Sequence, residues 1–204
     1  MQLSRAIIAT PLGDMMALAS ETGLCALEFT GPRIPKSEVR SQKSEARPNF
    51  SRQTSALPAS GDRLTRLDTR LSRWFPPHEI VDGDTRVIAR TRKWLASYFA
   101  GTSPAAPDIP LDMRGADFEK RVWTALRAIP PGQTTSYGAI ARSLGDAGAS
   151  RAVGAANGAN PVAIIVPCHR VIGSTGSLTG YGGGLERKKW LLDHERRWGV
   201  GQLF

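Results

Sequence analysis

The stretch from Asn160 to Ile172 constrains the fold of this chain more than any other. Residues 162–166 are apolar and mostly β-branched, and the run has the length of a strand. A short apolar run does not by itself distinguish a strand from a buried helical segment, but its composition leads us to predict a buried strand. Pro167 restricts its own φ angle and favours extended geometry in the residue before it. The chain therefore leaves the run in a defined direction, and Cys168 and His169 follow at once.

A cysteine beside a histidine suggests nucleophilic chemistry. The thiolate is the reactive form, and a free thiol titrates near pH ~8.5, so an adjacent base is the usual means of activation. His169 is the candidate base for Cys168. The alternative is that Cys168 is a small buried hydrophobe, which is the commoner role of such a cysteine. Neighbours on a strand also point to opposite faces, so the pair alone leaves both interpretations open.

The charge of the chain is uneven along its length. The 204 residues suffice for one large domain or two small ones with a core each. The formal net charge is +9, and residues 114–204 carry 12 Lys and Arg against 6 Asp and Glu, whereas residues 1–113 carry 15 against 12. This excess favours a polyanionic partner for the C-terminal part. A surplus that serves only solubility is the alternative.

Cysteine and histidine usage predicts no metal site. Cys25 and Cys168 lie far apart, and His78, His169 and His194 form no ligand pattern with them. We expect a reduced, cytoplasmic protein. No apolar run approaches the roughly 18 residues of a membrane span, and no secretory signal is recognisable.

The N-terminal part shows the pattern of a small sheet followed by helices. Short alternating segments predict three antiparallel strands, at residues 4–10, 15–20 and 24–29. Residues 31–60 contain four prolines, six serines and six Lys and Arg, which predicts a mobile surface loop. Two amphipathic helices follow, with Asp62 and Asp84 as the expected N-caps.

The C-terminal part begins at Asp117 with a helix that Pro130 and Pro131 end. Thr135 or Ser136 caps a second helix, and a third begins at Ser150. Two short helices joined by about five residues predict a helix-turn-helix. A last helix is expected from residue 185 to about 196.

The third of these helices is made almost entirely of small residues. After Arg151 its side chains, up to residue 157, are those of Ala, Val, Gly, Ala, Ala and Asn. Such a helix suits a minor groove about 6 Å wide, with little reading of base edges. Close packing against another helix is the alternative. Arg151 favours DNA, because an arginine in the first turn opposes the helix dipole and suggests a role outside the fold.

Residues 173–184 contain six glycines. Glycine lets backbone amides approach a ligand closely, although a flexible connector would have the same composition. The segment lacks the Gly-Lys-Ser/Thr ending of a P-loop.

Taken together, these motifs resemble one known family, the O6-alkylguanine-DNA alkyltransferases. The resemblance runs in register from about Phe118 to Glu195, and the Pro-Cys-His-Arg-Val core is its most specific part. The segments that carry it are Ser136-Tyr137-Gly138, Ser150-Arg151-Ala152-Val153-Gly154, Asn160-Pro161, Pro167-Cys168-His169-Arg170-Val171-Ile172, Gly180-Tyr181-Gly182-Gly183-Gly184-Leu185 and Lys189-Trp190-Leu191-Leu192 with Glu195.

The resemblance implies direct DNA repair without a cofactor. An alkyl group, typically methyl, would pass irreversibly from O6-alkylguanine to Cys168, once per protein molecule, and O4-alkylthymine is a further candidate substrate. His169 would take the thiol proton through a water molecule, and Glu195 would orient His169, as an activated nucleophile requires.

The same resemblance assigns the substrate pocket. Tyr137 would hydrogen-bond the guanine ring and help to neutralise it as it leaves. Asn160 would brace the turn before the cysteine. The main chain of the cysteine and of Val171 would accept from the amino group of the base, and Tyr181 with the amide of Gly182 would form the pocket wall and an O6 contact.

For DNA, the resemblance implies a monomer that binds the minor groove of double-stranded DNA independently of sequence. The target base must be flipped out, because a thiolate cannot reach its alkyl carbon inside the duplex. Arg151 would fill the vacated space. The neighbouring contacts would come from Ser150, Ala152, Gly154 and Ala155.

The expected architecture is an α/β protein of two domains. Residues 1–100 would form the ribonuclease-H-like domain with its three-stranded antiparallel sheet. Residues 101–116 would be a linker, and residues 117–204 a mainly helical, winged-helix-like domain with the buried cysteine. Two other functions stay open: a sensor that binds alkyl lesions without transfer, and a cysteine hydrolase that uses Cys168, His169 and Glu195.

Overall fold

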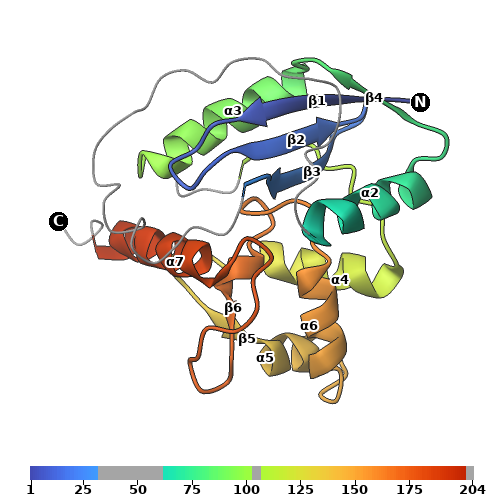
Figure 1. Ribbon diagram of the computed structural model, residues 1–204. Helices are drawn as coiled ribbons and strands as arrows, with labels where there is room; N and C mark the ends of the chain where they lie inside the picture. The colour runs from blue at the N-terminus through green and yellow to red at the C-terminus, as the bar shows by residue number, and fades with distance from the viewer. Residues whose placement is uncertain (32–61, 103–106, 201–204) are drawn as a thin grey trace.

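The protein is a mixed α/β molecule with an N-terminal sheet and a mainly helical C-terminal half (Figure 1). The computed structural model describes residues 1–31, 62–102 and 107–200. Nearly all of the loop predicted at residues 31–60 lies outside these ranges. Within them, no helix is both long enough and apolar enough to cross a membrane.

The N-terminal sheet has four strands in the order β3-β2-β1-β4. The three predicted strands are confirmed with slightly different bounds, as β1 Gln2–Ile8, β2 Met15–Ala19 and β3 Leu24–Phe29. The prediction of a purely antiparallel, three-stranded sheet is wrong, because β4 (Glu79–Asp82) pairs in parallel with β1. Its four residues carry too short a pattern to reveal a strand, and its pairing partner lies more than 70 residues away in sequence.

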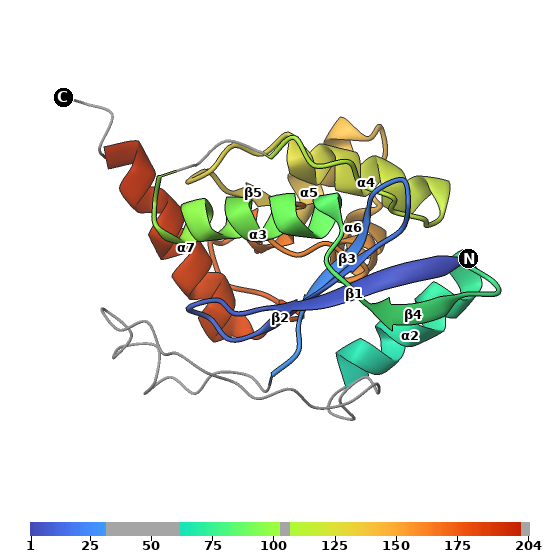
Figure 2. The same cartoon turned by 90° about the horizontal axis from the view of Figure 1, so that it is seen from above.

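Helices cover both faces of this sheet (Figure 2). Helix α2 (Asp62–Trp74) packs on one face and α3 (Arg86–Phe99) on the other. Side chains alternate along β2 accordingly, since successive residues of a strand point to opposite faces. Met16 and Leu18 join the cluster under α2, whereas Met15 and Ala17 join the larger cluster that contains α3. That larger cluster continues into the C-terminal half and includes Trp123, Val153, Val166 and Cys168.

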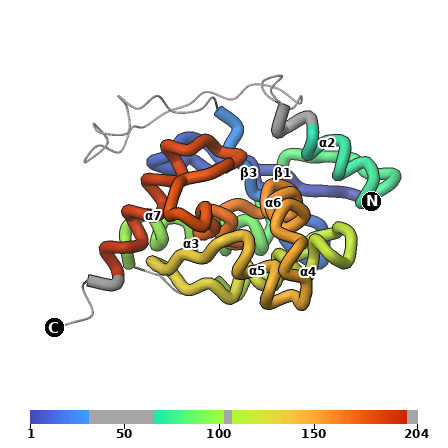
Figure 3. The backbone as a smooth tube through the Cα atoms, turned by 90° about the horizontal axis from the view of Figure 1, so that it is seen from below, coloured from blue at the N-terminus to red at the C-terminus, as the bar shows by residue number. Residues whose placement is uncertain are grey.

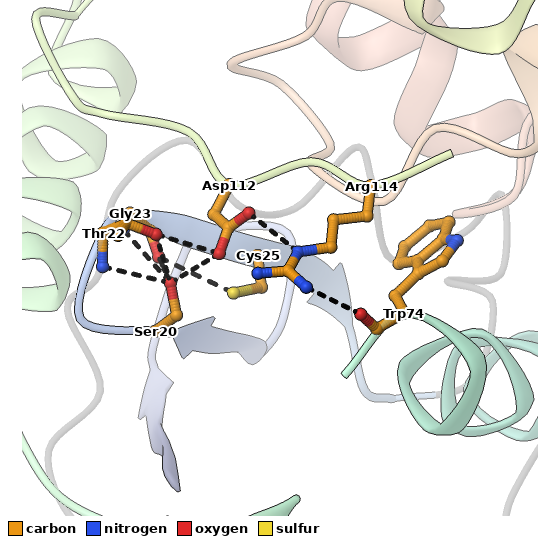
Figure 4. Close-up of polar contacts among 7 residues, drawn as sticks. All are labelled: Ser20, Thr22, Gly23, Cys25, Trp74, Asp112 and Arg114. Atoms are coloured by element: carbon orange, nitrogen blue, oxygen red, sulfur yellow. Dashed lines mark hydrogen bonds and ion pairs between the residues drawn. The ribbon is translucent and has the colours of Figure 1, made fainter. Parts of the chain in front are cut away.

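The segment between the two halves is bound to the sheet rather than spanning freely. Backbone hydrogen bonds join Leu24 N to Pro110 O (2.8 Å) and Asp112 N to Leu24 O (3.0 Å). The Asp112 carboxylate accepts from the hydroxyls of Ser20 (2.8 Å) and Thr22 (3.0 Å), as Figure 4 shows. Residues 110–112 therefore join the sheet edge at the start of β3 through an isolated bridge between Leu24 and Leu111. The division into two domains at this segment stays a prediction.

Arg114 continues this connection toward α2 (Figure 4). Its Nε donates to Asp112 (3.2 Å) and a terminal nitrogen donates to Trp74 O (3.0 Å), while its guanidinium lies 4.3 Å from the centre of the Phe75 ring. Burial acts to raise the pKa of Asp112, but the hydrogen bonds from Ser20, Arg114 and the neighbouring threonine outweigh it and lower that pKa.

In the C-terminal half, residues 107–200 form four α-helices and a second, two-stranded sheet. The elements are α4 Asp117–Arg127, β5 Thr135–Ser136, α5 Tyr137–Ser143, α6 Ser150–Gly158, the 3-10 turn η1 Cys168–Arg170, β6 Val171–Ile172 and α7 Leu185–Val200. The four predicted helices are present, and α7 extends four residues beyond its expected end. Helices α5 and α6 pack side by side (Figure 3). They lie at the end of the molecule that is remote from the sheet (Figure 1).

The helix starts differ in detail from the sequence prediction. The Ser136 hydroxyl caps α5 by accepting from Ala139 N (3.2 Å). For α3 the cap is Thr85, which accepts from Ile88 N, and not Asp84. Asp117 is the first residue of α4 and not its cap. Thr and Asp have similar capping preferences, so the sequence alone did not select between Asp84 and Thr85. The N-cap of α4 is Ala116, whose backbone N donates to Glu119 Oε2 (2.9 Å).

The predicted strand at residues 162–166 is the main error. The run is buried, but only its first residues pair with β3, through Leu27 N to Pro161 O (2.9 Å) and Ala163 N to Leu27 O (2.8 Å). Ile164 then adopts φ +71°, and Val166 N bonds back to the carbonyl of residue 162 (3.0 Å). The chain therefore forms a tight apolar turn. A β-branched residue rarely adopts positive φ, so no propensity rule would have predicted this turn.

We predict that Asp112→Ala destabilises the protein through the connecting segment. The change removes the acceptor that the Ser20 and Thr22 hydroxyls share with Arg114 Nε, at a cost of about 1–2 kcal/mol, or about 3–6 °C in Tm. Thermal unfolding followed by circular dichroism measures this. Asp108→Ala is the control, because Asp108 is fully exposed in its ion pair with Arg90. Equal midpoints for the two variants would contradict the role assigned to Asp112.

Candidate active site

Cys168 lies in the core at the start of the η1 turn. Its side chain is 3% exposed, and its backbone N donates to Val166 O (2.8 Å). His169 is completely buried. A 3-10 turn has about three residues per turn, so the two side chains diverge by roughly 120° instead of pointing to opposite faces. The sequence objection to cooperation between Cys168 and His169 therefore does not hold.

His169 is held by the carboxylate of Glu195. The distance from Nε2 to Oε1 is 2.9 Å, and both side chains are fully buried. A carboxylate only accepts hydrogen bonds, so Nε2 carries the proton and Nδ1 has the free lone pair. Nδ1 is buried, with no hydrogen-bond partner among the residues the structure describes. Burial lowers the pKa of His169, and its contact with Glu195 offsets only part of this effect, which favours a neutral imidazole that can act as a base.

Glu195 accepts hydrogen bonds from four residues. Besides His169, Arg170 donates through Nε to Oε2 and through a terminal nitrogen to Oε1, both at 2.8 Å. Gly132 N donates to Oε2 (3.1 Å) and the Tyr98 hydroxyl to Oε1 (2.7 Å). Burial acts to raise the pKa of Glu195, but the hydrogen bonds and charges of His169 and Arg170 outweigh it and hold that pKa far below its usual range. The carboxylate therefore stays ionised.

Asn160 ties the buried turn to the end of α6. Its Nδ2 donates to Val166 O (2.7 Å) and its Oδ1 accepts from Val162 N (3.0 Å). The side chain is 1% exposed. One residue thus closes the turn from both sides and determines where the chain enters η1.

Tyr137 is brought beside this segment by the small β5–β6 sheet. Thr135 pairs with Val171 and Ser136 with Ile172, so the start of α5 lies next to the chain that leaves η1. The Tyr137 side chain is half-buried, and its hydroxyl accepts from Thr179 Oγ1 (3.3 Å). Gly154 of α6 faces the Tyr137 ring: a Cβ built there would lie 3.8 Å from it.

The pocket residues beyond η1 are held by a buried lysine. Lys188 Nζ donates to Val171 O and Thr179 O, both at 2.6 Å, and lies close to Gly180 O (3.5 Å). Burial lowers the pKa of Lys188 to about 8, and the charge of the Cys168 thiolate opposes this shift. Tyr181 is 8% exposed, with its ring centre 6.5 Å from that of His169.

The residues predicted to contact DNA lie on α6, apart from the cluster around Glu195. Arg151, Ala152 and Ala155 are exposed, whereas Ser150 and Gly154 are half-buried. Gly182 of the predicted pocket is also exposed. Val153, Ala156 and Asn157 form the buried face of the helix. The inner face packs closely on α4 and α5, as the packing interpretation expects. The outer face carries Arg151 and small side chains, and its contact with DNA stays a prediction.

Comparisons with known proteins identify the family of the chain. Residues 117–197 match the family model described as 6-O-methylguanine DNA methyltransferase, DNA binding domain. A methylated-DNA–protein-cysteine methyltransferase of Mycobacterium tuberculosis H37Rv is 61% identical over 140 residues, which are 69% of this chain and 84% of the relative. The chain belongs to the methylated-DNA–protein-cysteine methyltransferases, EC 2.1.1.63.

Solved structures of this methyltransferase family match along nearly the whole chain. The O6-methylguanine methyltransferase of M. tuberculosis superposes with a TM-score of 0.68 at 35% identity, covering 96% of this chain and 93% of the other. The M. tuberculosis protein in complex with DNA gives a TM-score of 0.66 at 36% identity, covering 97% and 94%.

Sequence reasoning missed several residues that surround the methyltransferase site. Tyr98 and Gly132 come from outside the motifs and meet Glu195 only through tertiary packing. Lys188 carried a signal that could have been read: with Leu191 and Glu195 it stands at i, i+3 and i+7 on the buried stripe of α7. A lysine at a core position of a helix indicates a specific partner.

We predict that Glu195→Gln lowers the free energy of unfolding by about 3–5 kcal/mol at pH 7, because it breaks the buried ion pair between Glu195 and Arg170. The pKa of Glu195 is lower in the folded state than the ordinary ~4.3 of the unfolded chain, so its contribution is complete above that value and is lost as the pH falls through and below it. The difference in the free energy of unfolding between wild type and Glu195→Gln should therefore shrink below pH ~4. Urea unfolding at several pH values measures it, and a difference independent of pH would contradict this account.

Proposed function

We propose that the protein repairs DNA by transferring an alkyl group from O6-alkylguanine to Cys168, directly and irreversibly, after the base has been flipped out of the duplex. The observation that carries this proposal is the buried Cys168 followed by His169, whose Nδ1 has no hydrogen-bond partner among the described residues while its Nε2 is bound to the Glu195 carboxylate. Nothing else among the described residues offers a thiol with such a base beside it.

In the proposed step, His169 Nδ1 takes the proton of the Cys168 thiol through a water molecule. The thiolate sulfur then attacks the alkyl carbon, a C–S bond forms, and the bond from that carbon to O6 breaks. Its electron pair stays on the guanine. Because the thioether is not hydrolysed, each protein molecule reacts once and no cofactor is consumed.

The departing guanine must be neutralised, because an anionic leaving group in a buried pocket is costly. The proton that balances the reaction originates from the Cys168 thiol and must reach the ring. Tyr137 is the proposed hydrogen-bond partner for the ring during this transfer, and its hydroxyl meets the Gly-rich segment through Thr179. Tyr181 and the amide of Gly182 are proposed as the pocket wall and the O6 contact.

The outer face of α6 is proposed to enter the minor groove. Arg151 stands at its first turn, and the exposed side chains of Ala152 and Ala155 leave the helix narrow. A helix without base-reading side chains suits a repair protein that must accept any sequence. The M. tuberculosis relative solved with DNA supports this partner. We propose that one protein molecule binds each lesion.

A sensor that binds the lesion without transfer is the alternative function. Such a protein would not require the His169–Glu195 pair or the constrained thiol. The ionised Glu195 and the neutral His169 favour transfer, since together they supply the base that a thiol needs.

We predict one added alkyl group per protein after mixing equimolar protein with a duplex that contains one O6-methylguanine. Peptide mass spectrometry should locate it on Cys168. Cys168→Ser should not be methylated yet should still bind, because a hydroxyl is a far weaker nucleophile at neutral pH. Cys25→Ala is the matched control: burial raises the pKa of the Cys25 thiol to about 11, so its removal should leave methylation complete. An unmodified wild-type protein that binds the lesion would establish the sensor instead.

We predict that Arg151→Ala slows repair in duplex DNA at least about tenfold, which corresponds to ~1.4 kcal/mol in the barrier. The arginine would no longer occupy the space left by the flipped base. Reaction with free O6-benzylguanine needs no flipping and should keep the wild-type rate. Single-turnover kinetics on both substrates measure the ratio, and equal losses would eliminate the flipping role.

A further inference from the structure

Tyr98 reaches the site from the N-terminal half of the chain. It lies in the last turn of α3, is fully buried, and donates its hydroxyl to Oε1 of Glu195 at 2.7 Å. The sequence between Tyr98 and Glu195 spans 97 positions. Burial, followed by the charge of Glu195, raises the pKa of Tyr98 well above its ordinary value, so the hydroxyl keeps its proton and remains a donor.

Oε1 of Glu195 is shared among three donors. Tyr98 lies at 2.7 Å, Arg170 at 2.8 Å and His169 Nε2 at 2.9 Å. A carboxylate oxygen has about two lone-pair directions, so donors to one oxygen compete. The more charge Tyr98 draws from Oε1, the less is available to attract the Nε2 proton of His169.

We propose that Tyr98 is a positioning residue that acts through Glu195: its hydroxyl limits how strongly the carboxylate stabilises protonated His169, and so keeps the imidazole a neutral base during alkyl transfer. This inference rests on the proposed function, because it assigns His169 as the base. It adds a contribution from the N-terminal half to a reaction whose other groups come from the C-terminal half.

Other charged and titratable groups also face His169 or its partner, and they remain in place when the Tyr98 hydroxyl is removed. They are Glu195, Arg170, Lys188, Cys168, Tyr181 and His194. Arg170 and Lys188 both lower the pKa of His169 through their charges. Tyr98 differs from Arg170 and Lys188 because its side chain is neutral. Its hydroxyl can therefore be deleted without a change in net charge.

The ring of Tyr98 is held independently of its hydroxyl. It packs against Trp94 and Trp198 at 5.1 Å between ring centres, against Phe99 at 5.4 Å and against His194 at 5.5 Å. Aromatic contacts at such distances are favourable in themselves. The variant Tyr98→Phe keeps this packing, and Arg170 and Gly132 still hold the carboxylate, so the hydroxyl can be tested alone.

The test is the pH dependence of single-turnover alkyl transfer from O6-benzylguanine, measured from pH 5 to 9. A base that must be neutral gives a rate that falls on the acid side. In Tyr98→Phe the carboxylate interacts more strongly with protonated His169 and raises the pKa of that imidazole. The acid limb of the profile, where the rate falls as the pH is lowered, should therefore move to higher pH by about half a unit. At the wild-type midpoint, where the wild-type rate is half of its plateau, the rate of the variant should then be about a quarter of its own plateau. A limb that is unmoved or moves to lower pH overturns the proposal.

Thr91→Val is the matched control. Thr91 lies on the same helix and is equally buried. Its hydroxyl donates to Val87 O (2.9 Å) and not to Glu195. It should lower the Tm without moving the acid limb. If Tyr98→Phe behaves in the same way, Tyr98 has only a structural role. If the wild-type protein transfers no alkyl group to Cys168, the proposed function fails and the role of Tyr98 with it.

A second substitution covers the case in which Tyr98→Phe does not fold. Replacement of Tyr98 by 3-fluorotyrosine keeps the ring and the hydroxyl but makes the hydroxyl a stronger donor. The acid limb should then move to lower pH, opposite to the phenylalanine variant. A shift upward, or none, in a folded fluorinated protein overturns the proposal.

Discussion

The buried carboxylate of Glu195 is the interaction on which the rest of the structure depends. A buried charge is tolerated only when it is paired and fully hydrogen-bonded. Glu195 meets this condition through donors from three separate places: Tyr98 on α3, the backbone of Gly132 after α4, and the His169–Arg170 pair in η1. Each donor segment must therefore be in its native position before this charge is satisfied, and the site and the tertiary fold form together.

How far the sequence predicts the structure depends on whether a signal is local. Strands β1 to β3 and the helices α4 to α6 were predictable, because alternation, capping residues and prolines act within a few positions. The strand β4 and the pairing of β5 with β6 were not, since segments of four and two residues carry no period of their own. The run at residues 162–166 shows the limit most clearly: its apolar character predicted burial correctly but not the turn at Ile164.

The residues of the site also differ in whether a local sequence motif identifies them. Cys168, His169 and Glu195 could be named because their motif is specific, and the structure places His169 Nε2 2.9 Å from Glu195 Oε1. Tyr98 could be identified only as a core aromatic, because nothing in its helix indicates that its hydroxyl is needed elsewhere. The buried arginine of α7 was likewise not predictable from local sequence. Arg187 donates to Leu12 O (2.8 Å) and to Gly183 O (2.9 Å), so α7 joins the turn between β1 and β2 to the glycine-rich residues 173–184.

The contact between Tyr98 and Glu195 has a consequence for how such proteins can vary. Helix α3 supplies a polar group to a charge that belongs to the other half, within a cage of aromatic rings drawn from both. A chimera that joins the N-terminal half of one relative to the C-terminal half of another would place foreign rings around that carboxylate. The halves of this fold are consequently poor units of recombination, and substitutions in α3 and α7 should accumulate as compensated pairs.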